Sequence, residues 1–183
     1  VGNISDNFGK TDKNSLFLNS GILIDSRVYS FKSESISIEP KTLESIFDFN
    51  EVDEEFYIDK KDLKKWKKLK GPNSVKREKD GFVYNYSMGG IGFDKLNKPS
   101  RTIITGEGGK SPSRFKHIVQ LPDGRHRRLT PVELERLNGF PDNWTKLEGV
   151  TNTKRAFFMG NALVCGVVEL ISSTLFNIFK EYE

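Results

Sequence analysis

Two glycine-rich segments, each placed directly after a predicted β-strand, carry the residues best suited to contact a ligand closely. The first is Ser87-Met-Gly-Gly-Ile-Gly-Phe and the second is Gly106-Glu-Gly-Gly-Lys-Ser-Pro-Ser-Arg. Glycine lets a backbone N–H or C=O approach a ligand that a Cβ would keep away. Because Lys110, Arg114 and Lys116 accompany the second segment, DNA bases and phosphates are candidate ligands. Neither segment has P-loop or dinucleotide-binding spacing, so a pair of flexible turns is the alternative interpretation.

The remaining chemically active side chains are scattered along the sequence. His117 and His126 flank a predicted turn, and no Cys or carboxylate cluster has metal-ligand spacing with them. We therefore expect surface histidines and no metal site. The single Cys165 excludes a disulfide within the chain and fits a reducing compartment. It lies in an apolar stretch, so we expect a small packing residue and not a nucleophile.

Residues 59–80 concentrate positive charge, with ten Lys or Arg against four Asp or Glu in a chain whose net charge is +4. Leu63, Trp66 and Leu69 recur every three residues, which predicts a helix with one apolar stripe and a basic outer face. The mildly basic pI of about 9.0 weakly favours a polyanionic partner. The helix face has two open interpretations, a solvated surface or a surface that contacts DNA phosphates.

The clearest helix signal is the stretch from Arg127 to Pro141. Thr130 stands at the N-cap position and Pro131 at the first helical position, where its missing N–H is harmless. Glu133 is placed to close a capping box, and Gly139 supplies a left-handed end to the helix. This short, firmly bounded helix is expected to hold neighbouring segments in place.

Other elements follow from apolar periodicity and turn residues. The apolar run from Ala162 to Phe179 is interrupted by polar residues, so we expect a buried terminal helix and not a membrane span. A short helix is expected after Pro40. The predicted strands are Ser15–Leu18, Gly21–Ile24, Arg27–Phe31, Phe82–Tyr86, Arg101–Thr105, Arg114–Leu121 and Arg125–Leu129, with hairpin turns at Asp25-Ser26 and Pro122-Asp123-Gly124.

Several of these motifs together resemble the DNA cytosine-5 methyltransferases. Residues 127–141 resemble motif IX of that family, and Met-Gly-Asn-Ala-Leu-Val at 159–164 resembles motif X at the spacing the family shows. Thr102-Ile103 leading into Gly106-Glu-Gly-Gly resembles the Thr-Leu pair and glycine-rich loop of the target-recognition domain. The resemblance is strong from Pro99 onward and looser before it, where residues 15–115 resemble bacterial members that methylate GGNCC-like sites.

The resemblance implies an α+β fold. Residues 1–129 would form a small, mostly antiparallel β target-recognition lobe, and residues 130–183 a helical segment that packs on an absent α/β, Rossmann-like catalytic domain. No secretory signal opens the sequence, and its first residue is Val1 and not Met. Because the catalytic domain is also absent, we expect either a truncated chain or one subunit of a split enzyme.

The implied activity is methyl transfer from S-adenosylmethionine to C5 of a flipped cytosine in double-stranded DNA, in a bacterial restriction–modification setting in the cytoplasm. Flipping the base costs a few kcal/mol that protein contacts must offset. The family's Pro-Cys nucleophile and its Glu-Asn-Val, Phe-x-Gly-x-Gly and Gln-x-Arg-x-Arg motifs do not occur in this sequence. We therefore assign no catalytic residue to this chain, and expect it to be inactive without a catalytic domain or subunit.

The resemblance also assigns roles to individual residues. Arg101, Lys110 or Arg114 would pair with guanine, so Arg114→Ala is expected to relax specificity at one base position. The expected DNA-binding residues are Ser87, Gly89, Gly90, Arg101, Thr102, Thr105, Gly108, Gly109, Lys110 and Arg114. Asn161 and Ala162 would form one wall of the cofactor pocket. The expected organisers of the motif IX junction are Arg128, Thr130, Glu133 and Arg136.

Two other classes of function compete with this interpretation. One is a free-standing DNA-binding module, and the other is a small-molecule site formed by the glycine loops. A free-standing module has no need of the motif X segment or of such an apolar terminal helix. The small-molecule hypothesis is weakened because the sequence shows no catalytic dyad or carboxylate cluster.

Overall fold

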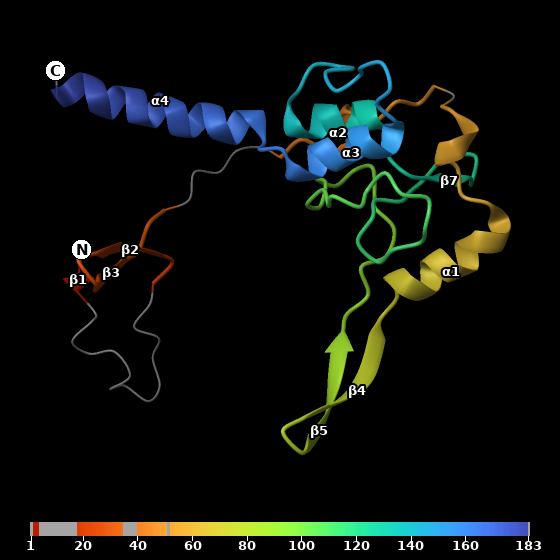
Figure 1. Cartoon of the computed structure of the whole chain (residues 1–183), viewed down its shortest axis with the longest axis horizontal. Coiled ribbons are helices and arrows are strands. Elements are labelled where there is room, and N and C mark those ends of the chain that lie inside the picture. The colour runs from red at the N-terminus through yellow and green to blue at the C-terminus, as the bar shows by residue number, and fades with distance from the viewer. Residues whose placement is uncertain (1, 4–17, 35–39, 51, 183) are drawn as a thin grey trace. The chain divides into compact units, whose positions relative to one another are not determined.

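The computed structural model describes residues 2–3, 18–34, 40–50 and 52–182, which belong to two compact units, Val1–Glu39 and Pro40–Glu183 (Figure 1). The fold is mixed α+β, with small antiparallel sheets and helices. The predicted strand at 15–18 lies almost wholly outside the described residues. The expected division at residue 129 concerns function and stays a prediction.

The first unit contains a three-stranded antiparallel sheet in the order β1-β3-β2. Strands β2 (Ser20–Ile24) and β3 (Arg27–Phe31) form the predicted hairpin, with Ile22 opposite Tyr29. Strand β1 (Gly2–Asn3) pairs with the other edge of β3. The turn residues Asp25 and Ser26 have φ of 46° and 62°, as a tight hairpin turn that matches strand twist requires.

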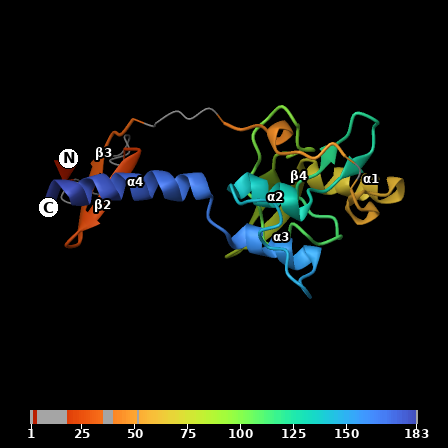
Figure 2. The ribbon, with the colours of Figure 1, turned by 90° about the horizontal axis from the view of Figure 1, so that it is seen from above.

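The core of the second unit forms where α2 (Pro131–Asn138) and α3 (Asn152–Asn161) pack together. Both ribbon views show these two helices side by side (Figures 1 and 2). The 3₁₀ turn η2 (Leu43–Ser45) and strand β6 (Val119–Gln120) also contribute. The buried core residues are Leu43, Ile46, Phe47, Val119, Leu129, Leu134, Ala156 and Met159. The core therefore joins residues from both sides of position 129.

Helix α1 (Lys60–Lys70) follows the 3₁₀ turn η3 (Glu54–Phe56) and leads into a two-stranded ribbon. Strands β4 (Asn73–Lys79) and β5 (Phe82–Met88) pair antiparallel. The helix predicted from Leu63, Trp66 and Leu69 is confirmed, and the basic residues that follow it lie on a strand. Gly71-Pro72 ends the helix, because a residue before proline is disfavoured in the helical conformation. The strand predicted at Phe82 is confirmed, while its partner β4 was missed.

The strand predicted at Arg101–Thr105 is wrong: residues 101–104 are irregular and a turn follows over 105–108. Helix α3, and not another strand, lies against this segment. A Cβ added to Gly160 would stand 2.5 Å from the Thr105 backbone N. The hairpin predicted around Pro122-Asp123-Gly124 is confirmed, with Gly124 at φ 85°. Its strands are shorter than predicted, since only the two residues of β6 pair with β7 (His126–Arg127).

The C-terminal part contains two helices where one was expected. α3 was missed, and the motif X segment ends it; α4 (Cys165–Tyr182) begins after a short break. The expectation that α4 is buried is wrong within the described chain, since Leu170 is 50% and Phe179 66% exposed. By length and composition, Asn152–Glu181 could also cross a membrane, but a single such stretch is weak evidence.

Candidate nucleic-acid interface

The N-terminus of α2 is held by a buried ion pair in addition to its cap. The capping box is confirmed: the Glu133 N–H donates to Thr130 Oγ1 at 3.3 Å, and the Thr130 N–H donates to Glu133 Oε2 at 2.7 Å. Arg127 donates to both carboxylate oxygens of Glu133, at 2.7 and 2.8 Å. Both side chains are almost fully buried. Because the Asp48 N–H also donates to Glu133, one carboxylate joins β7, α2 and the segment after η2.

Sequence reasoning missed Arg127. Its side chain lies over the ring of Phe47, with the guanidinium carbon 3.8 Å from the ring centre. Arg127 and Arg128 are both buried, at 1% and 3% exposure. Alternation along a strand turns only one of two adjacent residues inward, so the pattern alone could not predict that both would be buried.

Arg128 and Arg136 connect the motif IX segment to more distant parts of the chain. Arg128 Nη1 donates to the Gly108 carbonyl at 2.9 Å, and its Nη2 donates to the carbonyl of Glu55. Burial lowers the pKa of the Arg128 guanidinium. Arg136 pairs with Asp142 at 2.7 Å and donates to the Ile46 carbonyl at 3.1 Å.

Two glycines allow the second glycine loop to pack tightly against α3. A Cβ on Gly108 would lie 2.7 Å from Thr153 Cα and 2.8 Å from Ala156 Cβ. A Cβ on Gly160 would lie within 2.6 Å of the Ile104 carbonyl group. Real Cβ atoms do not approach backbone this closely. Each segment therefore needs a glycine where the other crosses it.

Both histidines are buried, so the prediction of surface histidines is wrong. His117 has no exposed surface and His126 has 8%. Glu107 accepts from the His117 N–H, and His117 Nδ1 lies 3.0 Å from Glu107 Oε1. On its other side, His117 Nε2 lies 3.0 Å from Ser100 Oγ. Burial, with Lys67 nearby, lowers the pKa of His126.

Two further observations concern this buried polar region. Glu107 Oε2 is buried without a partner among the described residues. The described ranges also contain no group of three or more His, Cys, Asp or Glu able to hold a metal ion.

Asp94 organises a second buried polar cluster beneath the loops. It accepts from Arg101 Nε at 2.7 Å and from the Ile118 N–H at 2.9 Å. Burial alone would raise the pKa of Asp94, but the hydrogen bond from Arg101 and neighbouring positive charge bring it below its ordinary value. Arg101 also donates to the Phe115 carbonyl at 3.0 Å. Its guanidinium is therefore engaged within the protein.

Lys70, the last residue of α1, is the third member of this cluster. Its Nζ lies 3.9 Å from the Asp94 carboxylate and donates to the carbonyls of Arg114 and Lys116. Burial of the amine lowers its pKa to about 8. The Lys70 carbonyl accepts from the Ile91 N–H at 2.8 Å. One residue thus connects the end of α1 to both glycine loops.

Arg114 holds the base of the ribbon. Its Nη1 donates to the carbonyls of Leu69 at 3.1 Å and Gly71 at 2.7 Å, and its Nη2 donates to the carbonyl of Gly89. Gly71 precedes β4 and Gly89 follows β5, so one guanidinium spans both ends of the ribbon. The roles of Arg101 and Arg114 at a base stay predictions, and their contacts show that both position the loops.

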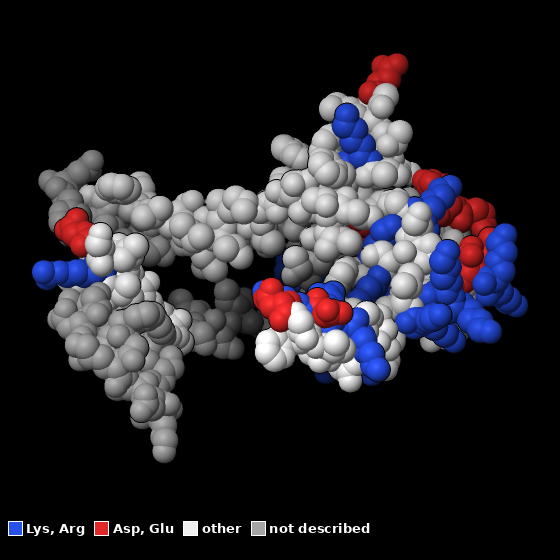
Figure 3. Space-filling view, turned by 60° about the horizontal axis from the view of Figure 1, so that its bottom comes forward, with Lys and Arg blue, Asp and Glu red and all other residues white. Residues whose placement is uncertain are grey.

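Other predicted DNA-binding residues are on the surface. Those classed as exposed are Ser87, Gly89, Gly90, Thr102, Thr105 and Lys110. Gly108 and Gly109 are half-buried, and Gly108 faces α3. The exposed lysines of α1 are Lys60, Lys61, Lys64, Lys65, Lys67 and Lys68. Figure 3 shows Lys and Arg side chains gathering on the side of the second unit where α1 lies.

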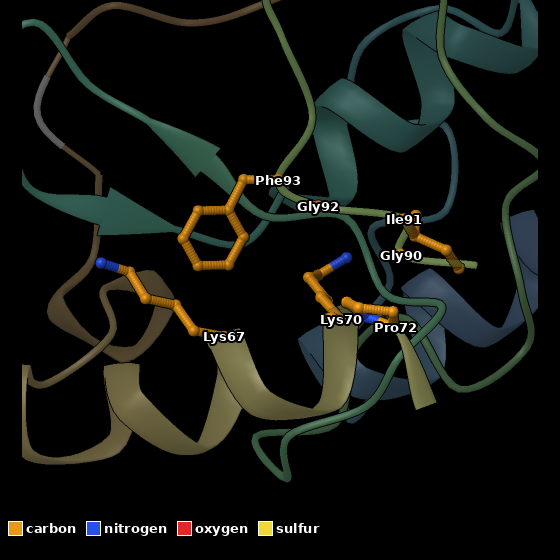
Figure 4. A pocket seen from close by; sticks show the side chains of 8 residues that line it. Lys67, Lys70, Pro72, Gly90, Ile91, Gly92 and Phe93 are labelled. Carbon is orange, nitrogen blue, oxygen red and sulfur yellow. The ribbon is translucent and has the colours of Figure 1, made fainter. Parts of the chain in front are cut away.

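Two open cavities border these elements. A cavity of about 450 Å³ lies between the C-terminal end of α1 and residues 90–93, with the Phe93 ring and Lys67 along it (Figure 4). A cavity of about 360 Å³ is lined by residues 100–103, α2 and the motif X segment, including Ala162. Asn161 is exposed, and its Nδ2 donates to the Phe157 carbonyl at 2.9 Å.

Comparisons with known proteins agree with one another. Residues 10–177 match the family model described as C-5 cytosine-specific DNA methylase. The chain is 40% identical over 177 residues to the type II methyltransferase M.Sau3AI of Staphylococcus aureus, covering 96% of this chain and 40% of that protein. The chain therefore spans about two fifths of the length of this relative.

Solved structures show a related fold at low sequence identity. The methyltransferase EhMeth of Entamoeba histolytica matches 84% of the chain and 48% of its own, with a TM-score of 0.56 and 19% identity. The Dnmt2 methyltransferase of S. pombe matches 84% of the chain and 51% of its own, with a TM-score of 0.56 and 18% identity. These matches support the fold assignment.

Proposed function

Because the chain belongs to the C-5 cytosine-specific DNA methylase family, we propose that it is the target-recognition and C-terminal part of a bacterial DNA cytosine-5 methyltransferase of the restriction–modification type. Its relative M.Sau3AI is a type II methyltransferase, of which the chain spans 40%. The whole enzyme would act inside the cell on double-stranded DNA and transfer a methyl group to C5 of a flipped cytosine. In this proposal the chain recognises the target and completes the catalytic domain.

The DNA-facing surface combines the exposed parts of both glycine loops with the outer face of α1. Among the exposed residues, Thr102 and Thr105 carry hydroxyl groups that can bond to base edges or phosphates. The Lys110 side chain is 72% exposed, and its Nζ lies 3.7 Å from Glu55 Oε2 in an ion pair. Arg101 and Arg114 fix the loops from beneath through the contacts described above. We assign them to positioning.

The motif IX residues organise the junction and do not take part in chemistry. Arg128 holds the second glycine loop through the Gly108 carbonyl. Thr130 and Glu133 close the start of α2, and Arg136 ties its last turn to Ile46 and Asp142. These contacts fix the loops relative to the core of the second unit.

The methyl donor S-adenosylmethionine is the family's cofactor, and this chain fits one edge of its site. Ala162 and Gly160 line the open cavity of about 360 Å³, and Asn161 beside it is exposed. The bound cofactor would supply the methyl group. Gly160 and Ala162 would form a wall with little side-chain bulk, and the remaining walls would come from a catalytic part outside this chain.

A catalytic partner also accounts for α4. Its exposed apolar side chains include Leu170, Ile171 and Phe179, at 50–66% exposure. Large apolar surfaces of this kind mark sites of interaction. We propose that the catalytic domain or subunit covers α4, and that the chain alone transfers no methyl group because the family's nucleophile motif is absent from its sequence.

The observation that carries the proposal is that Lys70 and Arg114 join the basic helix α1, the ribbon and both glycine loops into one supported surface. If the exposed α1 lysines touch DNA phosphates, replacing Lys64 and Lys65 with Gln should lower the slope of log K against log salt by about 1.8. Fluorescence anisotropy with a labelled duplex between 50 and 200 mM salt measures this slope.

A matched control is available in the loop after α2. Lys146→Gln removes an exposed lysine far along the chain from α1, and it should leave the slope unchanged. If the slope stays the same in the Lys64/Lys65 variant, α1 is only a solubilising surface. If the unmodified chain shows no affinity for duplex DNA, the recognition function itself is wrong.

A further inference from the structure

The β4–β5 ribbon has two chemically different faces. In a strand, alternate residues point to opposite faces, and the register places Val75 opposite Tyr86, Arg77 opposite Tyr84 and Lys79 opposite Phe82. These six side chains therefore share one face, here called the aromatic face. It carries two cations, three aromatic rings and no acid.

The opposite face has a balanced and more polar character. Lys76 pairs with Asn85 and Glu78 with Val83, while Ser74 and Ser87 complete it with hydroxyls 3.0 Å apart. One lysine and one glutamate cancel in charge. The two faces of the same ribbon thus differ in net charge by two.

The aromatic face has no cover in the described part of the chain. Phe82 is 77% exposed, and Tyr84 and Tyr86 are 43% and 40% exposed. Figure 1 shows the ribbon extending away from the other elements of its unit. A two-stranded ribbon by itself is only marginally stable in water, and these three exposed rings bury little surface within the chain. Their exposure therefore points to a role other than stabilising the fold.

The side chains on this face are arranged to present positive charge. The Arg77 guanidinium carbon lies 4.3 Å from the centre of the Tyr86 ring, which holds the arginine against the ring while its N–H groups can still reach a ligand. Arg77 and Lys79 are two residues apart, so they leave the face about 7 Å from each other. Phosphates follow each DNA strand every ~3.4 Å of helix axis, so the two cations can meet different phosphates.

The ribbon is also continuous with the proposed DNA surface. Two residues separate the end of the basic helix α1 from the start of β4, and β5 runs into the first glycine loop. Arg114 fixes both ends of the ribbon through the carbonyls of Gly71 and Gly89. The orientation of the ribbon is thereby coupled to the loops expected to reach the bases.

We propose that the aromatic face of the β4–β5 ribbon is a second DNA-contact surface that holds the sugar-phosphate backbone of the duplex beside the recognised site. Arg77 and Lys79 contact phosphates, the Tyr84 and Tyr86 hydroxyls can donate to phosphate oxygens, and Phe82 packs on sugar at the end of the ribbon. These contacts add affinity and orientation without reading sequence. The inference rests on the proposed DNA-recognition function and adds a surface to it.

The test compares two variants of the 183-residue chain in the same salt titration with a labelled duplex. Arg77→Gln/Lys79→Gln should lower the slope of log K against log salt by about 1.8, equally on duplexes of different sequence. Lys76→Gln, a cation on the opposite face of the same ribbon, should leave the slope unchanged. Thermal unfolding of each variant checks that the exposed substitutions leave the fold intact.

Each outcome decides the question. An unchanged slope in the double variant, with normal DNA binding by the unmodified chain, overturns the ribbon inference and leaves the proposed function standing. An equal drop per charge in Lys76→Gln overturns the assignment to one face. Absence of DNA binding by the unmodified chain overturns the recognition function, and the ribbon inference with it.

Discussion

At the scale of single residues, glycines and buried charged side chains position the glycine loops, including residues whose types first suggested direct contact with a ligand. Arg101 and Arg114 look like base readers in the sequence, yet each donates to carbonyls or a carboxylate inside the protein. Gly108 and Gly160 lie where the second glycine loop crosses α3, and a Cβ on either would collide with backbone atoms of the other segment. Both positions therefore require a residue without a Cβ.

This gives a prediction for Gly160→Ala. The added methyl would stand 2.5 Å from the Thr105 backbone N, which cannot move aside as a flexible side chain would. Such overpacking should lower the free energy of unfolding by about 1–3 kcal/mol. Urea unfolding followed by circular dichroism measures the loss.

Gly89→Ala is the matched control for this substitution. Nothing lies within 4 Å of a Cβ added there, and its φ is not in the left-handed region. The change should stay within about 0.5 kcal/mol. Equal effects of the two substitutions would mean that the contact between α3 and residues 104–105 does not matter for stability.

At the scale of elements, patterns with strong local signals were predictable from sequence. The capped helix α2 and the hairpins β2–β3 and β6–β7 have turn and cap residues that determine local conformation without help from the rest of the chain. Strand β4 was not predictable by apolar alternation, because it is exposed along its length and rich in charge.

The candidate site was predictable in its residue types more than in its geometry. The sequence pointed to both glycine loops and the basic helix, and in the structure each of these segments has residues exposed on the surface. It could not show that Lys70 is the lysine of α1 that turns inward, since its partners Asp94, Arg114 and Lys116 are 24–46 residues away. It also could not show that His117 would be buried against Glu107.

Buried Lys70 leads to a prediction about pH. Its pKa falls from 10.5 to about 8 in the folded chain, so between these values the unfolded state binds the proton that the folded state has released. The free energy of unfolding should therefore rise with pH across this window, by at most about 3 kcal/mol. Below pH 8 both states carry the proton, and Lys70 adds no pH dependence.

The comparison variant for this measurement is Lys70→Met, which keeps the length of the side chain and removes the titrating group. The difference in thermal stability between the two proteins should change from pH 8 to 10 and be constant from pH 6 to 7.5. A difference that is constant over the whole range would mean that Lys70 keeps an ordinary pKa in the folded state.

At the scale of the whole molecule, the described chain is well packed at the junction of α2 and α3 and open along α4. No other element of the described chain covers the exposed apolar residues of α4. The chain spans 40% of M.Sau3AI, so the proposed catalytic part is the natural cover.

Without such a cover, the chain should self-associate through α4. Ile171 and Leu175, 56% and 48% exposed, lie one turn apart on one face. Replacing both with Lys should shift the chain towards monomer in sedimentation velocity at micromolar concentration, because apolar burial drives the association. Ser173→Lys/Asn177→Lys adds the same charge at the same spacing and should leave self-association in place. A monomeric unmodified chain would contradict the expectation.

The contacts at the base of the β4–β5 ribbon have a consequence for its length. Lys70 and Arg114 hold the ribbon entirely through backbone carbonyls and amides at its two ends, so no side chain of the ribbon is needed to attach it. Because side chains alternate with a period of two, deleting two residues from each strand would shorten the ribbon and keep both faces in phase. The ribbon can therefore be shortened or replaced without changing the core of the second unit.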